Sequence, residues 1–548
     1  MKTNDFVKLF SAKKINYDLF LILIIVLAFI IRIYGLDQKS FYYDEAVRML
    51  FAKNYHYLFF NIPSFMQLYI FILNLFLKAG LTEYWIRILS VIFSLLSIFF
   101  IYRLSSKLFN RETGLIGSFL MAISPVNIYY SREVTVYSII ILLALISVYT
   151  FYLSINSCKK RYWFLYLFCT VVMVYLHLFT FTLVISEIIF FVFFYKNHKK
   201  CLNFFLFSQL LILILSGFIF LLNFYENHTT VTANIFSITT EMINIIRIFN
   251  TGFKGNYFLL CMILPVYLFI LRNTLFGTKN YKTESKGLIL FSFIIPLILI
   301  FSSIFFIKIF LYRYMLFIMG FYYILLAIGI SGFNKNIKIY LLVAIYTFSI
   351  LSLKNYEGNN SFKVFPATYP ETNYKEISYY ILDNYKTGDL ILQTSFFTMP
   401  SLIYYTENKG LNPNILAFTS QNEKELVCFS FEGTKKDFSG PRKFTDNNKG
   451  ISDIIRLLYQ PIVKPYKIYK GFNYSEFLFK PENVQVKKHK RIWLVYLNIS
   501  ISEKVPLVPQ PISNMEVSDY LKKDFHLIFI KNFRICNIGL YSENSKEK

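Results

Sequence analysis

The chain has 548 residues, of which 55% are apolar, 20% are aromatic and only 16% are charged. This composition excludes an ordinary soluble enzyme and an intrinsically disordered chain. The formal net charge of +25 is scattered, mostly as lysine and arginine at the ends of apolar runs, which favours a membrane and no nucleic-acid partner. Apolar runs near the length that crosses a bilayer recur up to about residue 352, so we predict a polytopic α-helical membrane protein.

The first apolar run, Tyr17 to Tyr34, has no small-residue cleavage site after it, so we predict a retained span. Lysines precede this run, which places the N-terminus in the cytoplasm and the next loop outside. The run from Ser64 to Ala79 is interpreted as an interfacial or re-entrant helix on the outer side. With that interpretation, the basic loops that follow all lie on the cytoplasmic side.

Ten further spans are predicted after this helix, which makes eleven with the first. They cover roughly residues 85–104, 114–125, 134–155, 162–176, 179–195, 203–223, 255–272, 287–307, 312–332 and 337–352. An odd number of spans places the rest of the chain outside the plasma membrane. We therefore predict a transmembrane catalytic domain at 1–352 and an extracytoplasmic α/β domain at 353–548.

The C-terminal part has shorter apolar runs and a usual domain size. Its pattern predicts a helix over Glu371 to Tyr385 and strands over Asp389 to Gln393 and Arg491 to Leu497. Cys428 and Cys536 also lie here, and the sequence leaves open whether they are bridged.

The other four cysteines show neither a CxxC motif nor metal-ligand spacing. Cys158, Cys169, Cys201 and Cys261 lie in or beside predicted spans. We expect them to act there as small apolar residues.

An acidic pair, Asp44 and Glu45, stands in the first outer loop behind two tyrosines. Carboxylates beside a membrane span are costly to place and point to a function. Asp44 suits a general base that takes a proton from an acceptor hydroxyl, and it also suits the N-cap of a helix beginning at Glu45. Glu45 either orients a partner or is a solvated acid in the first helical turn.

The predicted topology brings three more polar sites to the outer face. Arg132 could hold a phosphate and Glu133 could contact a sugar or an arginine, or the two form a plain interfacial pair. Arg313, with Tyr314, opens a late span, where its planar fork suits a phosphate or it acts as a snorkelling anchor. His177, in a tight turn between two spans, is either a ligand contact or structural.

Four stretches together carry a resemblance to a known family. They are Gly35 to Ala46 with its Tyr-Asp-Glu-Ala, Trp85 to Arg111, Ser124 to Tyr137, and Arg313-Tyr314. In this order they resemble the GT-C membrane glycosyltransferases, in the branch of the dolichyl-phosphate-mannose–protein mannosyltransferases and their bacterial relatives, which include the aminoarabinose transferase of lipid A. The resemblance covers about residues 17–352.

This resemblance implies a polyprenyl-phosphate sugar as donor, Asp44 as the base, and Arg313 and Arg132 as the cations on the phosphate. The sequence departs from the family at two places. Asn61 stands near where the family often has His or Lys before a Pro-Pro pair, and Val134 follows Glu133 in place of an alanine-arginine pair. Asn61 is kept as a predicted substrate contact.

The predicted activity is therefore transfer of a sugar from a polyprenyl phosphate to an acceptor hydroxyl on a lipid, glycan or protein at the outer face. One base with direct attack predicts inversion at the sugar carbon. The sequence shows no phosphate-binding or dinucleotide-binding glycine motif, and no cofactor is required. A divalent cation on Asp44, Glu45 and Glu133 is left open. The alternatives are a transporter or flippase of lipid-linked sugars and a non-catalytic scaffold for envelope assembly.

Overall fold

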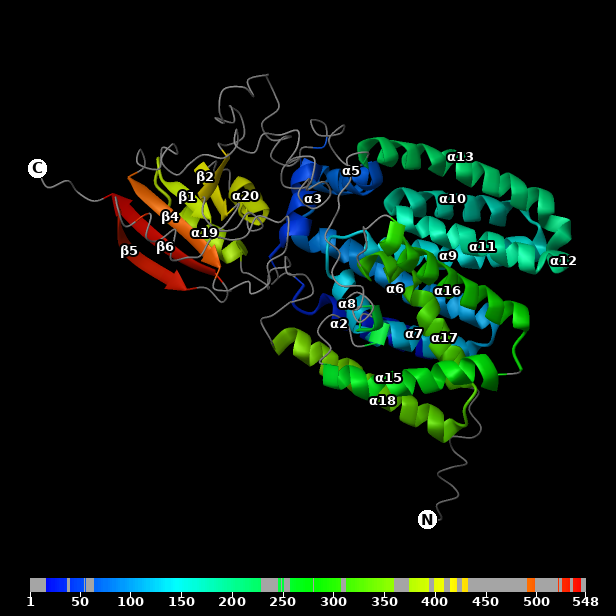
Figure 1. Cartoon of the computed structure of the whole chain (residues 1–548). Helices are drawn as coiled ribbons and strands as arrows, with labels where there is room; N and C mark the ends of the chain where they lie inside the picture. Colours follow the sequence, from blue (N-terminus) through cyan, green and yellow to red (C-terminus); the bar gives the residue numbers. More distant parts are fainter. Residues whose placement is uncertain are drawn as a thin grey trace, which may run out of the picture.

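The computed structural model shows a bundle of helices with a mixed β-sheet at one end (Figure 1). It describes residues 16–36, 40–53, 55, 64–227, 245–247, 249–250, 257–278, 280–306, 312–358, 374–393, 399–408, 414–420, 426–431, 490–497, 521, 525–532 and 536–543.

A helix overlaps each of the eleven predicted spans. These helices are α2 (Tyr17–Ile33), α6 (Glu83–Leu108), α7 (Arg111–Ile123), α9 (Tyr137–Ser157), α10 (Lys160–Leu176), α11 (Phe181–Phe193), α13 (Leu202–Asn227), α15 (Tyr257–Arg272), α16 (Thr283–Phe306), α17 (Met319–Ser331) and α18 (Lys335–Gly358). Within the described residues, seven helical segments are long and apolar enough to cross a membrane. They do not include α2, α7, α10 and α11, which have 13 to 17 residues, so the count of eleven spans is not confirmed.

Helix α17 lies at the centre of the bundle, because almost all of its side chains are buried. Two glycines allow its backbone to approach its neighbours. A Cβ at Gly320 would come within 2.8 Å of Leu145, and one at Gly329 would overlap the carbonyl oxygen of Ile270. Small residues at such contacts are the usual means of close packing between membrane helices. Helix α2, by contrast, exposes large apolar side chains along its outer face, as expected toward lipid.

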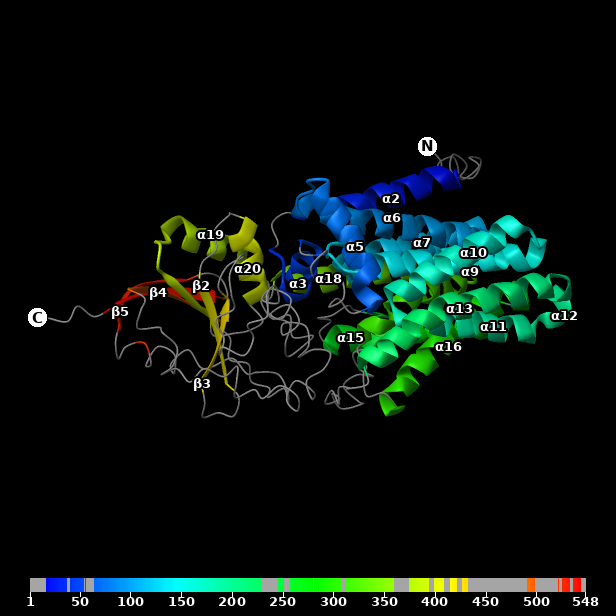
Figure 2. The ribbon, with the colours of Figure 1, turned by 90° about the horizontal axis from the view of Figure 1, so that it is seen from above.

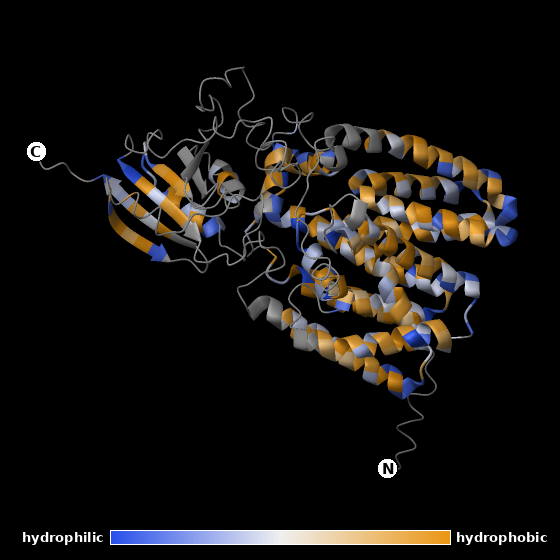
Figure 3. Ribbon diagram, in the orientation of Figure 1, coloured by the Kyte–Doolittle hydropathy of each residue, from blue (hydrophilic) through white to orange (hydrophobic). Residues whose placement is uncertain are grey.

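The two ends of the bundle differ in character. Helices α3 (Tyr43–Lys53), α5 (Ser64–Lys78) and α8 (Pro125–Ser131) lie at the end nearest the sheet (Figure 1). Hydrophilic residues gather around α12 (Tyr195–His198) at the opposite end (Figure 3). Helix α5 has 15 residues, fewer than a span normally needs, and packs against α3, α10 and α13, in keeping with an interfacial helix. Which end faces the cytoplasm stays a prediction.

The C-terminal sheet has six strands in the order β3-β2-β1-β4-β6-β5. The strands are β1 (Leu390–Gln393), β2 (Asn414–Ser420), β3 (Leu426–Phe431), β4 (Arg491–Leu497), β5 (Phe525–Asn532) and β6 (Cys536–Glu543). β1 pairs in parallel with β2 and β4, and the outer pairs are antiparallel. Helices α19 (Tyr374–Asn384) and α20 (Met399–Asn408) accompany it. The predicted helix and both predicted strands are confirmed.

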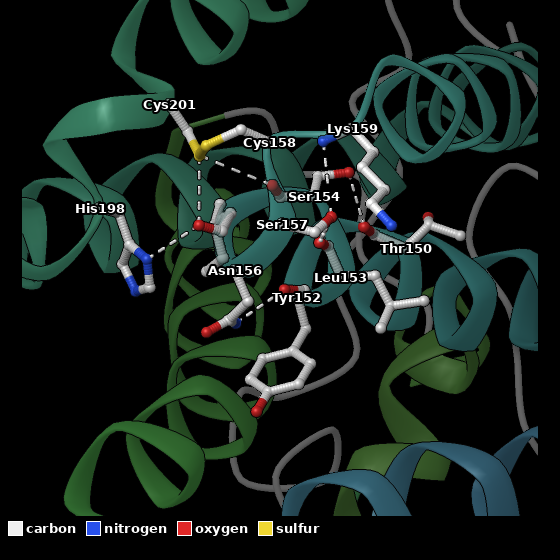
Figure 4. Close-up of a disulfide and its surroundings, with 11 residues drawn as sticks. Thr150, Tyr152, Leu153, Ser154, Asn156, Ser157, Cys158, Lys159, His198 and Cys201 are labelled. Carbon is white, nitrogen blue, oxygen red and sulfur yellow. Dashed lines mark hydrogen bonds between the residues drawn. A yellow bond between two sulfur atoms is a disulfide. The ribbon is translucent and has the colours of Figure 1, made fainter.

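A disulfide joins Cys158 and Cys201, whose Cα atoms are 5.4 Å apart (Figure 4). It links the end of α9 to the start of α13, and beside it a ring nitrogen of His198 lies 3.1 Å from the carbonyl oxygen of Ile155. The expectation that these two cysteines act as plain apolar residues is wrong. A separation of 43 residues gives no sign of pairing, which arises only when α10 and α11 fold back between the two ends.

Cys428 lies on β3 and Cys536 on β6, and three strands lie between β3 and β6 in the sheet.

We expect the disulfide to stabilise the bundle. The double variant Cys158→Ala/Cys201→Ala should unfold more readily than the natural protein by about 2–4 kcal/mol, and reductant should remove the difference. Thermal unfolding in detergent measures this, with Cys261→Ala, which removes a free exposed thiol, as the control. Full alkylation of Cys158 and Cys201 in protein purified without reductant would contradict the assignment.

Candidate active site

Asp44 and Arg313 are separated by 269 residues and meet in a direct ion pair. Asp44 lies in the first turn of α3, where the helix dipole favours an acid, and Arg313 lies in the 3₁₀ helix η5 (Tyr312–Ile318) that leads into α17. Nη1 of Arg313 donates to Oδ2 of Asp44 at 2.8 Å. Arg48, one turn further along α3, brings its Nη2 within 4.0 Å of the same oxygen. The prediction that Asp44 and Arg313 lie together is confirmed.

The charges around Asp44 decide its protonation state. Burial alone would raise the pKa of this carboxyl, but the charges of Arg313 and Arg48 and the hydrogen bond from Arg313 bring the pKa below its ordinary value. Asp44 is therefore ionised at neutral pH. Its side chain keeps 17% exposure and that of Arg313 15%, so both remain open to a small group. Two guanidinium groups, those of Arg313 and Arg48, thus lie near the carboxylate of Asp44.

Glu45 is fully buried, and both of its oxygens have partners. Oε2 lies 3.2 Å from Nη2 of Arg87, and Oε1 accepts the backbone N–H of Val134 at 2.8 Å. Oε2 also accepts the backbone N–H of Tyr42 at 3.3 Å, the return bond of a capping box. These contacts favour the hypothesis that Glu45 orients its neighbours and exclude a solvated acid.

Arg132 and Glu133, which follow α8, make contacts in two different parts of the structure. Glu133 is buried, and its Oε2 accepts the phenolic O–H of Tyr42 at 3.1 Å, so it lies against the Asp44 loop. Arg132 donates instead to the carbonyl oxygens of Tyr34 and Gly35, at 2.8 and 3.2 Å, and ties α8 to the end of α2. Within the described part of the chain Arg132 pairs with no carboxylate. The structure thus brings Glu133 to the site and turns Arg132 toward α2.

His177 and Tyr314 lie next to each other and close to Arg313. The ring centroids of His177 and Tyr314 are 5.2 Å apart, and Tyr314 stacks on Phe179. Burial, and to a smaller extent the charge of Arg313, lowers the pKa of His177 to about 3. His177 is therefore neutral at physiological pH and is no cation for a phosphate. Its buried Nδ1 has no hydrogen-bond partner among the residues described. Asn61 lies outside them.

Two arginines of this site were not predicted from the sequence. Arg48 stands four residues after Asp44, which is the spacing of a helical ion pair. Arg87 stands inside an apolar run, where an arginine needs a partner. Both signals were readable in the sequence.

The carboxylates of the site contact arginine and tyrosine, and the described residues contain no group of three or more His, Cys, Asp or Glu side chains arranged to hold a metal ion.

Comparison with known proteins finds a family match over part of the chain. Residues 63–222 match the model of the dolichyl-phosphate-mannose–protein mannosyltransferase family. Over this part, under a third of its length, the chain is similar to that family of membrane glycosyltransferases. None of the curated proteins matches the sequence.

Solved structures agree on the fold. The crystal structure of ArnT from Cupriavidus metallidurans in the apo state has a TM-score of 0.55 at 10% identity, over 95% of this chain and 97% of that one. The structure of the same protein bound to undecaprenyl phosphate has a TM-score of 0.55 at 9% identity, over 96% and 98%. At this identity the likeness shows a shared fold along nearly the whole chain.

We expect the Glu45–Arg87 pair to be a main stabilising contact of the site. Arg87→Met leaves the buried carboxylate of Glu45 uncompensated and should cost about 3–5 kcal/mol. Adding Glu45→Leu should restore part of this stability. Thermal unfolding in detergent checks both variants.

The exposed pair of Lys338 and Glu112 offers a control, because Glu112→Gln should change stability by about 0–1 kcal/mol. An equally small effect for Arg87→Met would contradict the assignment.

Proposed function

We propose that this protein transfers a sugar from a polyprenyl-phosphate donor to an acceptor hydroxyl, with inversion at the sugar carbon. The observation that carries the proposal is the ionised carboxylate of Asp44 in direct contact with Arg313 and next to Arg48. This arrangement offers a base in direct contact with a cation, on a fold shared with ArnT. The membrane glycosyltransferase family of residues 63–222 supports the same reaction class.

The donor phosphate has a natural partner in Arg313. A guanidinium presents parallel N–H donors that match phosphate oxygens, and the lipid-linked phosphate of ArnT's ligand is such a group. When a phosphate arrives, it competes with Asp44 for the same guanidinium. Arg313 then stabilises the charge that grows on the departing phosphate, and Asp44 is released from a strong ion pair and becomes more basic.

The bond changes of the step are simple. The acceptor oxygen attacks the sugar's anomeric carbon, the bond from that carbon to the phosphate oxygen breaks, and the polyprenyl phosphate leaves with the electron pair. Asp44 takes the proton of the acceptor hydroxyl. The phosphate is already a good leaving group, so the proposed reaction needs no nucleotide. Glu45, Arg87 and Glu133 hold the loop in place, and neutral His177 and Tyr314 are assigned to the sugar or phosphate oxygens.

The proposed setting is the outer face of the plasma membrane, with the sheet at the same end of the bundle as α3, the helix that carries Asp44 (Figure 1). The lysine-rich and arginine-rich ends of the helices then face the cytoplasm.

A transporter or flippase of lipid-linked sugars, or a non-catalytic scaffold, would also use cations for the lipid phosphate. Neither needs an ionised carboxylate held against those cations, and this observation favours the transferase.

Replacing the proposed base separates these functions. Asp44→Asn should lower transfer from a panel of polyprenyl-phosphate sugars by about 10²–10⁴-fold, measured by mass of the products, while binding of the polyprenyl phosphate persists. Arg313→Met should lower both transfer and binding of the polyprenyl phosphate. The matched controls are Asp383→Asn, an exposed acid of α19, and Arg161→Lys at the opposite end of the bundle. Undiminished transfer by Asp44→Asn would overturn the proposed mechanism.

The acid side of the pH profile should also report on Asp44. Because Arg313 and Arg48 lower the pKa of Asp44, kcat/KM should fall only as the pH drops below the ordinary range of an aspartate, near 3.9. Arg48→Met removes one lowering charge, so the pH at which kcat/KM reaches half its maximum should move upward. Lys338→Met, remote from the site, should leave the profile in place. A downward shift for Arg48→Met would refute the role of Asp44.

A further inference from the structure

The C-terminal part of the chain touches the loop that carries Asp44. The hydroxyl of Tyr405, on α20, accepts the backbone N–H of Phe41 at 2.7 Å and donates to Oε2 of Glu83 at 3.3 Å. On α19, the backbone N–H of Lys375 donates to Oγ of Ser40 at 3.0 Å, and its Nζ lies 3.6 Å from Glu83. Contacts that span more than 300 residues thus fix Ser40 and Phe41, which lie three and two residues before the start of α3.

These contacts continue into the site. The guanidinium of Arg87 lies over the ring of Phe41, with its Cζ 4.7 Å from the ring centroid. The same guanidinium pairs with Glu45, which neighbours Asp44 and holds the first turn of α3 through the N–H of Tyr42. From the hydroxyl of Tyr405 to the carboxylate of Asp44 there is a continuous series of packed and hydrogen-bonded groups.

These groups are buried, which keeps their relative positions fixed. Tyr405, Phe41 and Glu45 are fully buried and Arg87 is 1% exposed. The neighbouring residue on α20 secures the other end of α3, because the ring of Tyr404 packs on Phe41 at 5.2 Å and lies 4.9 Å from Nζ of Lys53. Buried hydrogen bonds of this kind define one geometry, and misplacing a base by about 1 Å is costly in rate.

We propose that Tyr405 is a positioning residue for the transfer reaction, and that the C-terminal part of the chain thereby sets the place of Asp44. This inference rests on the proposed function of Asp44. The hydroxyl of Tyr405 touches neither Asp44 nor Arg313, so its loss should affect turnover more than donor binding.

The test is Tyr405→Phe in the full-length protein, with Tyr380→Phe as the matched control. Tyr380, on α19, packs against Trp493 and Phe529 of the sheet. Tyr405→Phe removes both hydrogen bonds of the hydroxyl, so we expect kcat to fall about tenfold, with the KM for the lipid-linked sugar within twofold of its natural value. Hydrogen exchange should quicken in peptides covering residues 40–53, and neither change should occur in Tyr380→Phe.

Each other outcome counts against the proposal. A kcat within twofold of the natural value overturns it. So does a parallel change of kcat, KM, melting temperature and exchange throughout the chain, which marks a merely structural role. If the natural protein transfers no sugar at all, the proposed function fails, and exchange alone decides the coupling: faster exchange at residues 40–53 in Tyr405→Phe retains it, and unchanged exchange refutes it.

Discussion

A buried carboxylate must have a partner, and this requirement shapes the end of the bundle that carries the site. Leaving an ionised acid unpaired away from water costs several kcal/mol, which few proteins can tolerate. Asp44 and Glu45 therefore draw Arg313 and Arg87 to the same short helix from elements far apart in sequence. The two pairs differ in use. The Glu45–Arg87 pair is buried. The Asp44–Arg313 pair is partly exposed, and the guanidinium of Arg48 lies near the same carboxylate.

Another buried arginine shows that a charge within the bundle need not belong to the site. Arg32, in α2, donates to Oδ1 of Asn127 at 2.6 Å and to the carbonyl oxygen of Ala122 at 3.0 Å. It meets the carboxyl end of α7, where the helix dipole is negative and unpaired carbonyl groups accept hydrogen bonds. Arg32 thus joins α2 to α7 through hydrogen bonds to neutral groups. Its N–H donors are occupied by these bonds and do not suit a ligand.

The sequence was sufficient for contacts that follow from topology and insufficient for those that follow from packing. Asp44 and Arg313 were expected together because the positive-inside rule places both at one face. Arg87 was open to prediction as an arginine in an apolar run, and it was overlooked. Tyr405 could not be identified, since a tyrosine in a short helix looks the same whether it contacts the sheet or a loop 364 residues away. The strands β2, β3, β5 and β6 were also missed, although β2 with β3 and β5 with β6 form antiparallel pairs of strands that are consecutive in the chain.

The bond between Cys158 and Cys201 has a meaning beyond stability. Lysines stand beside both cysteines in the sequence, and Lys159 lies next to the disulfide (Figure 4), near α12 at the end of the bundle opposite the sheet, where hydrophilic residues gather (Figure 3). Under the positive-inside rule that end faces a compartment whose glutathione pool keeps thiols reduced, whereas the reverse orientation exposes it to oxidants. The oxidation state of Cys158 and Cys201 in living cells therefore indicates which way the chain is oriented in the membrane.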